Sequence, residues 1–167
     1  EVWSKILKEN NSQLILKNSF PDSEEYKNNI YNKFIRQGVS EKQIIFLDRE
    51  KMEEDHYKHY NKINLALDTF PYPGVTTSFE SILMGVPVLT LNGFNFNSRC
   101  GVSINKNIGM LDFIANNYDE YVSIAKKMSL DHELHFKNGI KLRERVINSS
   151  LFDTKTFAKD FEKILWQ

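Results

Sequence analysis

The residues best suited to chemistry stand where a short apolar segment gives way to a loop and then to a predicted helix. The apolar segment ends at Leu67, a loop rich in proline and glycine follows, and Thr76 and Thr77 open the helix. In an open parallel sheet, ligands bind beyond the carboxyl ends of the strands, and the free N–H groups of a helix start attract phosphate. Gly74 allows close backbone approach, and Glu80 is placed to accept hydrogen bonds from a ribose diol. The segment predicts a phosphate or diphosphate site.

The same residues also fit a purely structural interpretation. Thr77 and Glu80 have the spacing of a capping box, in which the glutamate side chain bonds a backbone amide at the start of its own helix. The carboxylate would then not face a ligand. The pattern supports capping and phosphate binding about equally. The Gly-x-Thr-Thr motif is weak by itself, and its position after a strand is what makes it informative.

The four histidines fall into two pairs, and each pair has the spacing that puts both rings on one face of a helix. The pairs are His56 with His59 and His132 with His135. Two such rings can share a metal ion, but no carboxylate stands at a recognised zinc-site spacing from them, so we expect no metal. His56 lies in an apolar helical stripe, where it is either a packing residue or a ring placed to stack on a nucleobase.

A second polar segment, 92–99, follows the last predicted strand. Ser98 is expected to cap the next helix, and Arg99 would then lie in its first turn, where a cation opposes the helix dipole. Such a cation serves either a bound anion or an acidic neighbour, and the second is the simpler explanation. No Ser/His/Asp or Cys/His arrangement is recognisable, and Cys100 resembles a small core residue. We therefore assign no catalytic residue.

Two kinds of segment alternate through the first two thirds of the chain. Short apolar runs without polar alternation are typical of strands buried on both faces of a parallel sheet. Between them, apolar residues recur with helical spacing, as in the segment between an Asp22-x-x-Glu25 helix start and Gly38. This predicts an α/β fold, a Rossmann-like parallel sheet with helices on both faces and a helical C-terminal tail. The expected strands are 14–16, 44–47, 64–67 and 86–91, with a short edge strand at 113–115.

Length, charge and cysteine content limit the class of protein. The chain has 167 residues with a hydrophobic fraction of 41%, enough for one core, and we expect 1–167 to form a single domain. The 22 basic and 22 acidic residues balance, which argues against nucleic-acid binding, and no apolar run reaches the ~20 residues of a membrane span. One cysteine fits a reducing, cytoplasmic location. A start without methionine or a signal-like segment suggests a fragment of a longer chain.

Several motifs occur in a fixed order along nearly the whole chain, and the block between Asp68 and Leu91 is the most specific. They are Asp55-His56-Tyr57, Leu67-Asp68-Thr69-Phe70-Pro71-Tyr72, Gly74-x-Thr76-Thr77-x-x-Glu80, Gly85-Val86-Pro87-Val88, Ser98-Arg99, Gly109-Met110-Leu111-Asp112 and Ser150-Leu151-Phe152-Asp153. This series closely resembles the C-terminal catalytic half of the O-linked N-acetylglucosamine transferase family. That family includes bacterial tetratricopeptide-repeat homologues and SPINDLY-type transferases.

The resemblance implies the C-terminal lobe of a GT-B glycosyltransferase, which holds a nucleotide-sugar donor without a metal or another cofactor. Such an enzyme is inverting and moves N-acetylglucosamine, or a related sugar, from a UDP-sugar to Ser or Thr of a protein. The protein acceptor enters from an upstream lobe and helical repeats.

Residue by residue, the resemblance also implies a donor site. His56 would stack on the uracil or lie beside it, and Glu80, where many relatives have Asp, would contact the ribose. His59 stands where some relatives have Arg near the nucleotide. A valine replaces the His that animal enzymes carry in the phosphate-binding turn. That turn, Gly74, Val75, Thr76 and Thr77, would hold the diphosphate.

Some parts of the family pattern precede the region that this chain matches. Relatives carry a further strand and a Lys that reaches the diphosphate, just ahead of the helix matching 2–8, and the acceptor lobe lies upstream as well. We therefore expect the chain alone to bind a donor weakly and to transfer no sugar. Two alternatives stay open, a GT-B-like binding module without activity and a nucleotide-sugar epimerase-like lobe. The epimerase is less well matched by the tail motif and Ser98-Arg99.

Overall fold

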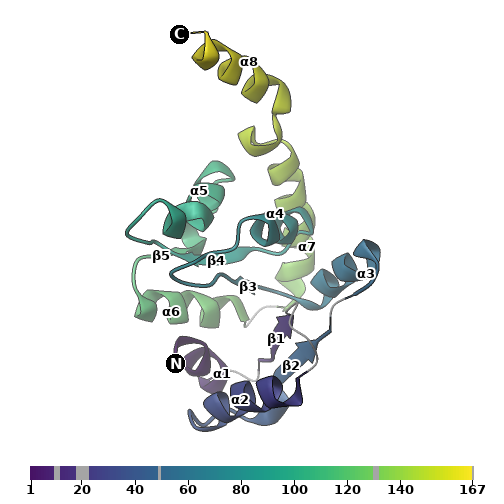
Figure 1. Ribbon diagram of the computed structural model, residues 1–167, viewed down its shortest axis with the longest axis vertical. Helices are drawn as coiled ribbons and strands as arrows, with labels where there is room; N and C mark the ends of the chain where they lie inside the picture. Colours follow the sequence, from purple (N-terminus) through teal and green to yellow (C-terminus); the bar gives the residue numbers. More distant parts are fainter. Residues whose placement is uncertain (10–11, 18–22, 49, 130–131, 167) are drawn as a thin grey trace.

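The computed structural model describes residues 1–9, 12–17, 23–48, 50–129 and 132–166. Strands and helices alternate through the first two thirds, and helices alone make up the rest (Figure 1). The strands are β1 (Leu14–Lys17), β2 (Ile44–Leu47), β3 (Ala66–Leu67), β4 (Val88–Leu91) and β5 (Ile114–Ala115). The helices are α1 (Val2–Glu9), α2 (Glu24–Ile35), α3 (Glu53–Lys58), α4 (Thr76–Leu83), α5 (Cys100–Asn107), α6 (Tyr118–Ser129), α7 (His132–Ile147) and α8 (Thr154–Leu165).

All strand pairs are parallel, as the unbroken apolar runs predicted. The strands form two sheets rather than the one that the sequence suggested: β1 pairs with β2, and β3, β4 and β5 form the other sheet in that order. The two sheets meet through side chains, because Leu16 of β1 and Leu67 of β3 pack into one cluster with Leu14. In this respect the expectation of a single sheet is wrong.

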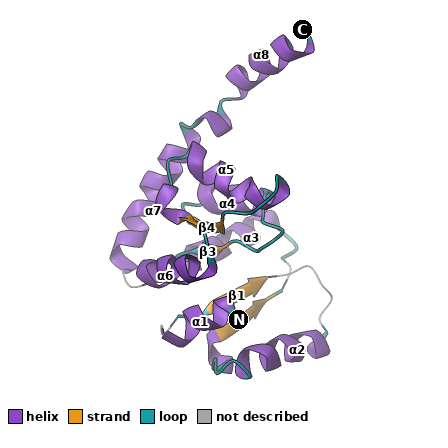
Figure 2. Ribbon diagram, turned by 90° about the vertical axis from the view of Figure 1, so that its left-hand side faces the viewer, coloured by secondary structure: helices purple, strands orange, loops and turns teal. Residues whose placement is uncertain are grey.

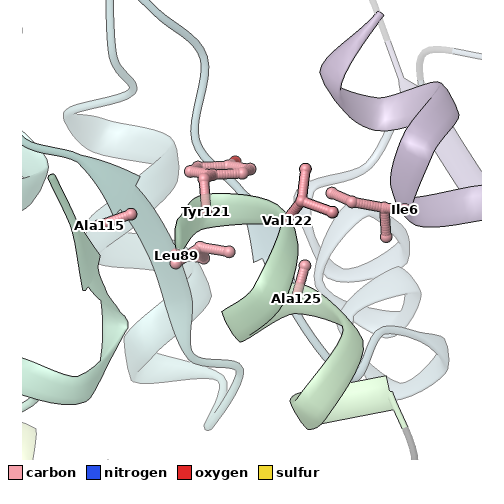
Figure 3. Close-up of a cluster of buried hydrophobic side chains, with 6 residues drawn as sticks. All are labelled: Ile6, Leu89, Ala115, Tyr121, Val122 and Ala125. Atoms are coloured by element: carbon pink, nitrogen blue, oxygen red, sulfur yellow. The ribbon is translucent and has the colours of Figure 1, made fainter. Parts of the chain in front are cut away.

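Helices cover both faces of the three-stranded sheet, which confirms the α/β prediction. Neighbouring residues of β4 point to opposite faces, so Leu89 packs toward α1 and α6 while Val88 packs toward α4, α5 and α7. Figure 3 shows the first of these clusters, in which Val122 of α6 lies between Leu89 of β4 and Ile6 of α1. Leu89 and Val122 are both buried. β4 is therefore the centre of the fold and fixes the helices on either side.

The helical tail is confirmed, and its last helix leaves the body of the molecule. In Figures 1 and 2, α8 extends beyond α7 at the end opposite β1 and β2. The Asp153 carboxylate caps this helix by accepting the backbone N–H of Thr156 at 3.0 Å. No residue of α8 is buried. No helix among the described residues combines the length and hydrophobicity needed to cross a bilayer.

Two predicted helix starts differ in detail from the structure. The helix expected from the Asp22-x-x-Glu25 box is α2, but Ser23 caps it, with its hydroxyl accepting the N–H of Tyr26; Asp22 lies outside the described residues. Ser98 does not cap α5. It is buried in a short 3₁₀ turn, Asn97–Arg99, where its hydroxyl bonds Asn95. Polar residues near a helix start compete for several local partners, so spacing alone misplaced both caps.

Candidate functional site

The start of α4 has the features that the sequence predicted for an anion site. Thr76 and Thr77 are its first two residues and are exposed, while the opposite side of the helix is anchored by buried Ser78 and Ile82. Val75 occupies the cap position and forms no side-chain cap bond. The first N–H groups of α4 are therefore not satisfied by a capping side chain, which is the arrangement that suits phosphate.

Gly74 is required for this turn because a larger residue would collide with the helix start. A Cβ at this position would lie 2.5 Å from the Thr77 hydroxyl and 2.8 Å from the Ser78 hydroxyl. The Ser78 hydroxyl also donates to the Gly74 carbonyl. The glycine thus lets the loop run against the first turn of α4.

Asp68, which follows β3, holds the loop to the sheet. Its buried carboxylate accepts the Gly74 N–H at 2.7 Å with one oxygen and the Thr90 hydroxyl at 2.8 Å with the other. Burial raises the pKa of this carboxyl, and the hydrogen bonds from Gly74 and Thr90 oppose the rise only in part. Sequence patterns alone indicate no role for Asp68 beyond its place in the motif. An aspartate directly after a buried strand and before a Pro/Gly loop was the available signal.

The Asp68→Asn variant is expected to change how stability depends on pH. A carboxyl whose pKa is higher in the folded chain binds more protons there than in the unfolded chain. Its contribution to stability therefore falls as pH rises above the ordinary value of 3.8. Asparagine can still accept the Gly74 N–H but does not titrate. Urea unfolding from about pH 4 to 7 should show the wild type losing stability relative to the variant as pH rises.

Asp153→Asn provides a control of opposite sign. The Asp153 carboxyl is exposed, and its hydrogen bonds with Thr156 lower its pKa, so its contribution is present at neutral pH and is lost as pH falls. Parallel pH curves for wild type and Asp68→Asn would contradict the role assigned to the buried carboxylate.

Glu80 faces α3 rather than the start of its own helix. Its Oε2 lies 3.3 Å from His56 Nε2 and accepts the Tyr60 hydroxyl at 3.4 Å. The capping-box interpretation of Thr77 and Glu80 is therefore wrong. Burial, together with the nearby Glu80 charge and hydrogen bond, raises the pKa of the Tyr60 phenol, so it stays a donor to this carboxylate at neutral pH.

The two histidines of the first pair have different partners. His56 and Glu80 are half-buried, and the Tyr57 and Tyr60 rings flank His56 at 5.5 and 5.6 Å between centroids. His59 instead places Nε2 2.8 Å from Glu50, and its buried Nδ1 has no hydrogen-bond partner among the described residues. The side chains of His132 and His135 lie outside the description. The structure thus joins His56, but not His59, to Glu80.

The segment after β4 has a structural role in this chain. Arg99 donates from Nε to the Gly93 carbonyl at 2.7 Å, so it holds its own loop. Cys100 is only half-buried, which differs from the core position predicted for it.

A cavity of about 300 Å³ opens beyond the carboxyl ends of β3 and β4, lined in part by Trp3, Phe70 and Tyr118. The predicted site and this cavity lie at the edge where open parallel sheets bind ligands.

Comparisons with known proteins agree with this architecture. The family model described as glycosyl transferase family 41 matches residues 1–161. A probable UDP-N-acetylglucosamine–peptide N-acetylglucosaminyltransferase SPINDLY from Eustoma exaltatum subsp. russellianum is 32% identical over 163 residues, 97% of this chain and 18% of the relative. The UDP-N-acetylglucosamine–peptide N-acetylglucosaminyltransferase of Caenorhabditis elegans is 28% identical over 168 residues, 100% of this chain and 14% of that protein.

A solved structure shows the same fold. A mutant of the O-GlcNAc transferase from Thermobaculum terrenum superposes with a TM-score of 0.90 at 28% identity, covering 98% of this chain and 32% of that one. The chain thus corresponds to about a third of that solved chain and spans less than a fifth of the curated relatives described above, 18% and 14% of their lengths. Since the family model covers nearly all of the chain, the chain belongs to glycosyl transferase family 41.

Proposed function

We propose that this chain is the donor-binding part of an inverting glycosyltransferase that moves N-acetylglucosamine, or a related sugar, from a UDP-sugar to Ser or Thr of a protein. The relatives from Eustoma exaltatum and Caenorhabditis elegans carry the corresponding activity in their names. Residues 1–167 would act as one domain in a longer cytoplasmic polypeptide. Its other parts would receive the protein acceptor.

One observation carries this proposal: the helix with the uncapped start also carries the carboxylate that contacts His56 of α3. Thr76 and Thr77 open α4, and Glu80, one turn further on, faces His56. A diphosphate at the helix start would place the attached ribose along the helix toward Glu80, with the base toward His56. Gly74 and Val75 would complete the phosphate-binding turn, and His59, bonded to Glu50, would contribute from outside this group.

The chemistry expected of these residues is electrostatic. When the bond between sugar and diphosphate breaks, negative charge grows on the departing diphosphate. Backbone N–H groups at the start of α4 and the two threonine hydroxyls are fixed donors for this charge, and fixed donors stabilise a transition state without reorganising. We propose that they take the place that a metal ion has in other sugar transferases, so the chain needs no cofactor.

A thermal-shift series tests the donor class. With UDP, UDP-N-acetylglucosamine, GDP and GDP-fucose each at ten times a millimolar dissociation constant, the uridine ligands should stabilise the fold by about 1.4 kcal/mol. That corresponds to a rise in Tm of roughly 3–5 °C for a chain of this size. The rise should be the same with EDTA and with Mg²⁺. If no nucleotide raises the Tm, the alternative of a binding module that holds no nucleotide-sugar donor is favoured. A rise confined to the guanosine ligands would overturn the choice of uracil as the base.

A further inference from the structure

A lysine from the other sheet reaches the histidine of the proposed donor site. Lys17 is the last residue of β1, and its Nζ lies 2.6 Å from His56 Nδ1. Both side chains are partly buried, and 39 residues separate them in the sequence. Among the described residues, no carboxylate forms an ion pair with Lys17. The His56 imidazole is therefore the hydrogen-bond partner of the Lys17 ammonium group.

This contact determines which nitrogen of His56 carries the proton. An ammonium group can donate hydrogen bonds but cannot accept them, so Nδ1 must be the accepting, unprotonated nitrogen. The ring proton then resides on Nε2, which lies 3.3 Å from the Glu80 carboxylate. The three groups therefore form an ordered row of cation, neutral ring and carboxylate.

We propose that Lys17 is a positioning residue for the donor base: it fixes His56 as the Nε2–H tautomer and holds the plane of the ring against which the base packs. This inference rests on the proposed function. The bond between His56 and Glu80 is long for a hydrogen bond, and the flanking tyrosine rings restrict tilt but not proton position. Lys17 supplies the short contact that fixes both the orientation of the ring and the position of its proton. Its role is to orient the ring, and it acts through His56 rather than on the ligand.

Nitrogen NMR of the histidine side chains tests the tautomer without any ligand. At about pH 8.5, above the range where histidines usually titrate, the wild type should show an unprotonated Nδ1 and a protonated Nε2 for His56, assigned with the His56→Ala variant. In Lys17→Met the two nitrogen shifts should move toward each other as both tautomers become populated. Lys58→Met is the matched control, because Lys58 is an exposed lysine paired with Asp55. An unchanged His56 pattern in Lys17→Met would overturn the proposal.

A double-mutant cycle with UDP then tests the positioning role. Lys17→Met should weaken UDP binding by roughly three- to tenfold, and Lys17→Arg should restore part of the loss. In the His56→Ala background, Lys17→Met should have no further effect. An equal loss in both backgrounds would show that Lys17 contacts the nucleotide itself and would overturn the inference, as would unchanged affinity despite a changed tautomer. If unaltered chain binds no nucleotide, the proposed function and the link to the donor base both fail, and the ring measurement still decides the tautomer.

Discussion

Replacing Thr76 and Thr77 together with valine is expected to weaken UDP binding by roughly a hundredfold or more. Each substitution removes one hydroxyl donor to an anionic group, and a charge-assisted hydrogen bond is worth about 1.5–3 kcal/mol. The unaltered chain should bind UDP with a dissociation constant on the order of millimolar, since the relatives' upstream lysine and second lobe lie outside the matched region. Binding by the double variant should therefore fall below detection.

The fold should survive this double substitution. Val75, not a threonine, occupies the cap position of α4, and the buried side of the helix is formed by Ser78, Ser81 and Ile82. Valine and threonine have similar helix propensities, so the loss of stability should stay below about 1 kcal/mol. The binding loss and the stability change can thus be separated.

An NMR titration with UDP decides the prediction. Thr154→Val is the matched control, because Thr154 is also the exposed first residue of a helix, α8, at the far end of the molecule. The control should bind UDP like the wild type. Equal chemical-shift changes in the double variant and the wild type would show that the ligand binds elsewhere, and sugar transfer by the chain alone would contradict the expectation that it is catalytically incomplete.

Sequence patterns predicted the strands and helices of this fold well, because apolar runs and helix starts depend on residues that are neighbours in the sequence. The apolar run at 44–47 became β2 with the same bounds, and Thr76 opened α4 as expected. The break between the two sheets was not predictable in this way. Which strand lies beside β1 is decided by contacts between distant segments, such as the packing of Leu16 and Leu67 against one buried cluster. No local pattern in a strand indicates which strand pairs with it.

The candidate site shows the same division. The phosphate-binding turn depends on neighbouring residues and could be proposed from the sequence. The contact of Glu80 with His56 spans 24 residues and that of Lys17 with His56 spans 39. The capping box was a local alternative for Glu80. In the structure its carboxylate instead contacts two residues distant in the sequence, the His56 ring and the Tyr60 hydroxyl. Lys17 carried no signal, since a lysine at the end of a strand is ordinarily a solvated residue.

Gly85 offers the largest expected effect on stability, and it connects the site to the core. The residue lies just beyond α4 with φ of +79°, where side chains other than hydrogen are strained. A Cβ there would lie 2.6 Å from the carbonyl oxygen of Gly139 in α7. Gly109 also has a positive φ, of +69°, but a Cβ there would meet nothing within 4 Å. A larger residue would meet the same unfavourable backbone conformation at both positions, but would collide with a neighbour only at Gly85.

Alanine substitutions at these two positions should therefore give different losses. Gly109→Ala should lower the free energy of unfolding by about 1–2 kcal/mol, from the left-handed backbone alone. Gly85→Ala adds overpacking between α4 and α7, about 1–3 kcal/mol, for a total of roughly 2–5 kcal/mol. Urea unfolding of both variants measures the difference, and equal losses would show that α7 moves aside freely. We expect relief of the clash to shift α4 against the sheet, so Gly85→Ala should also weaken UDP binding at Thr76 and Thr77, whereas Gly109→Ala should not.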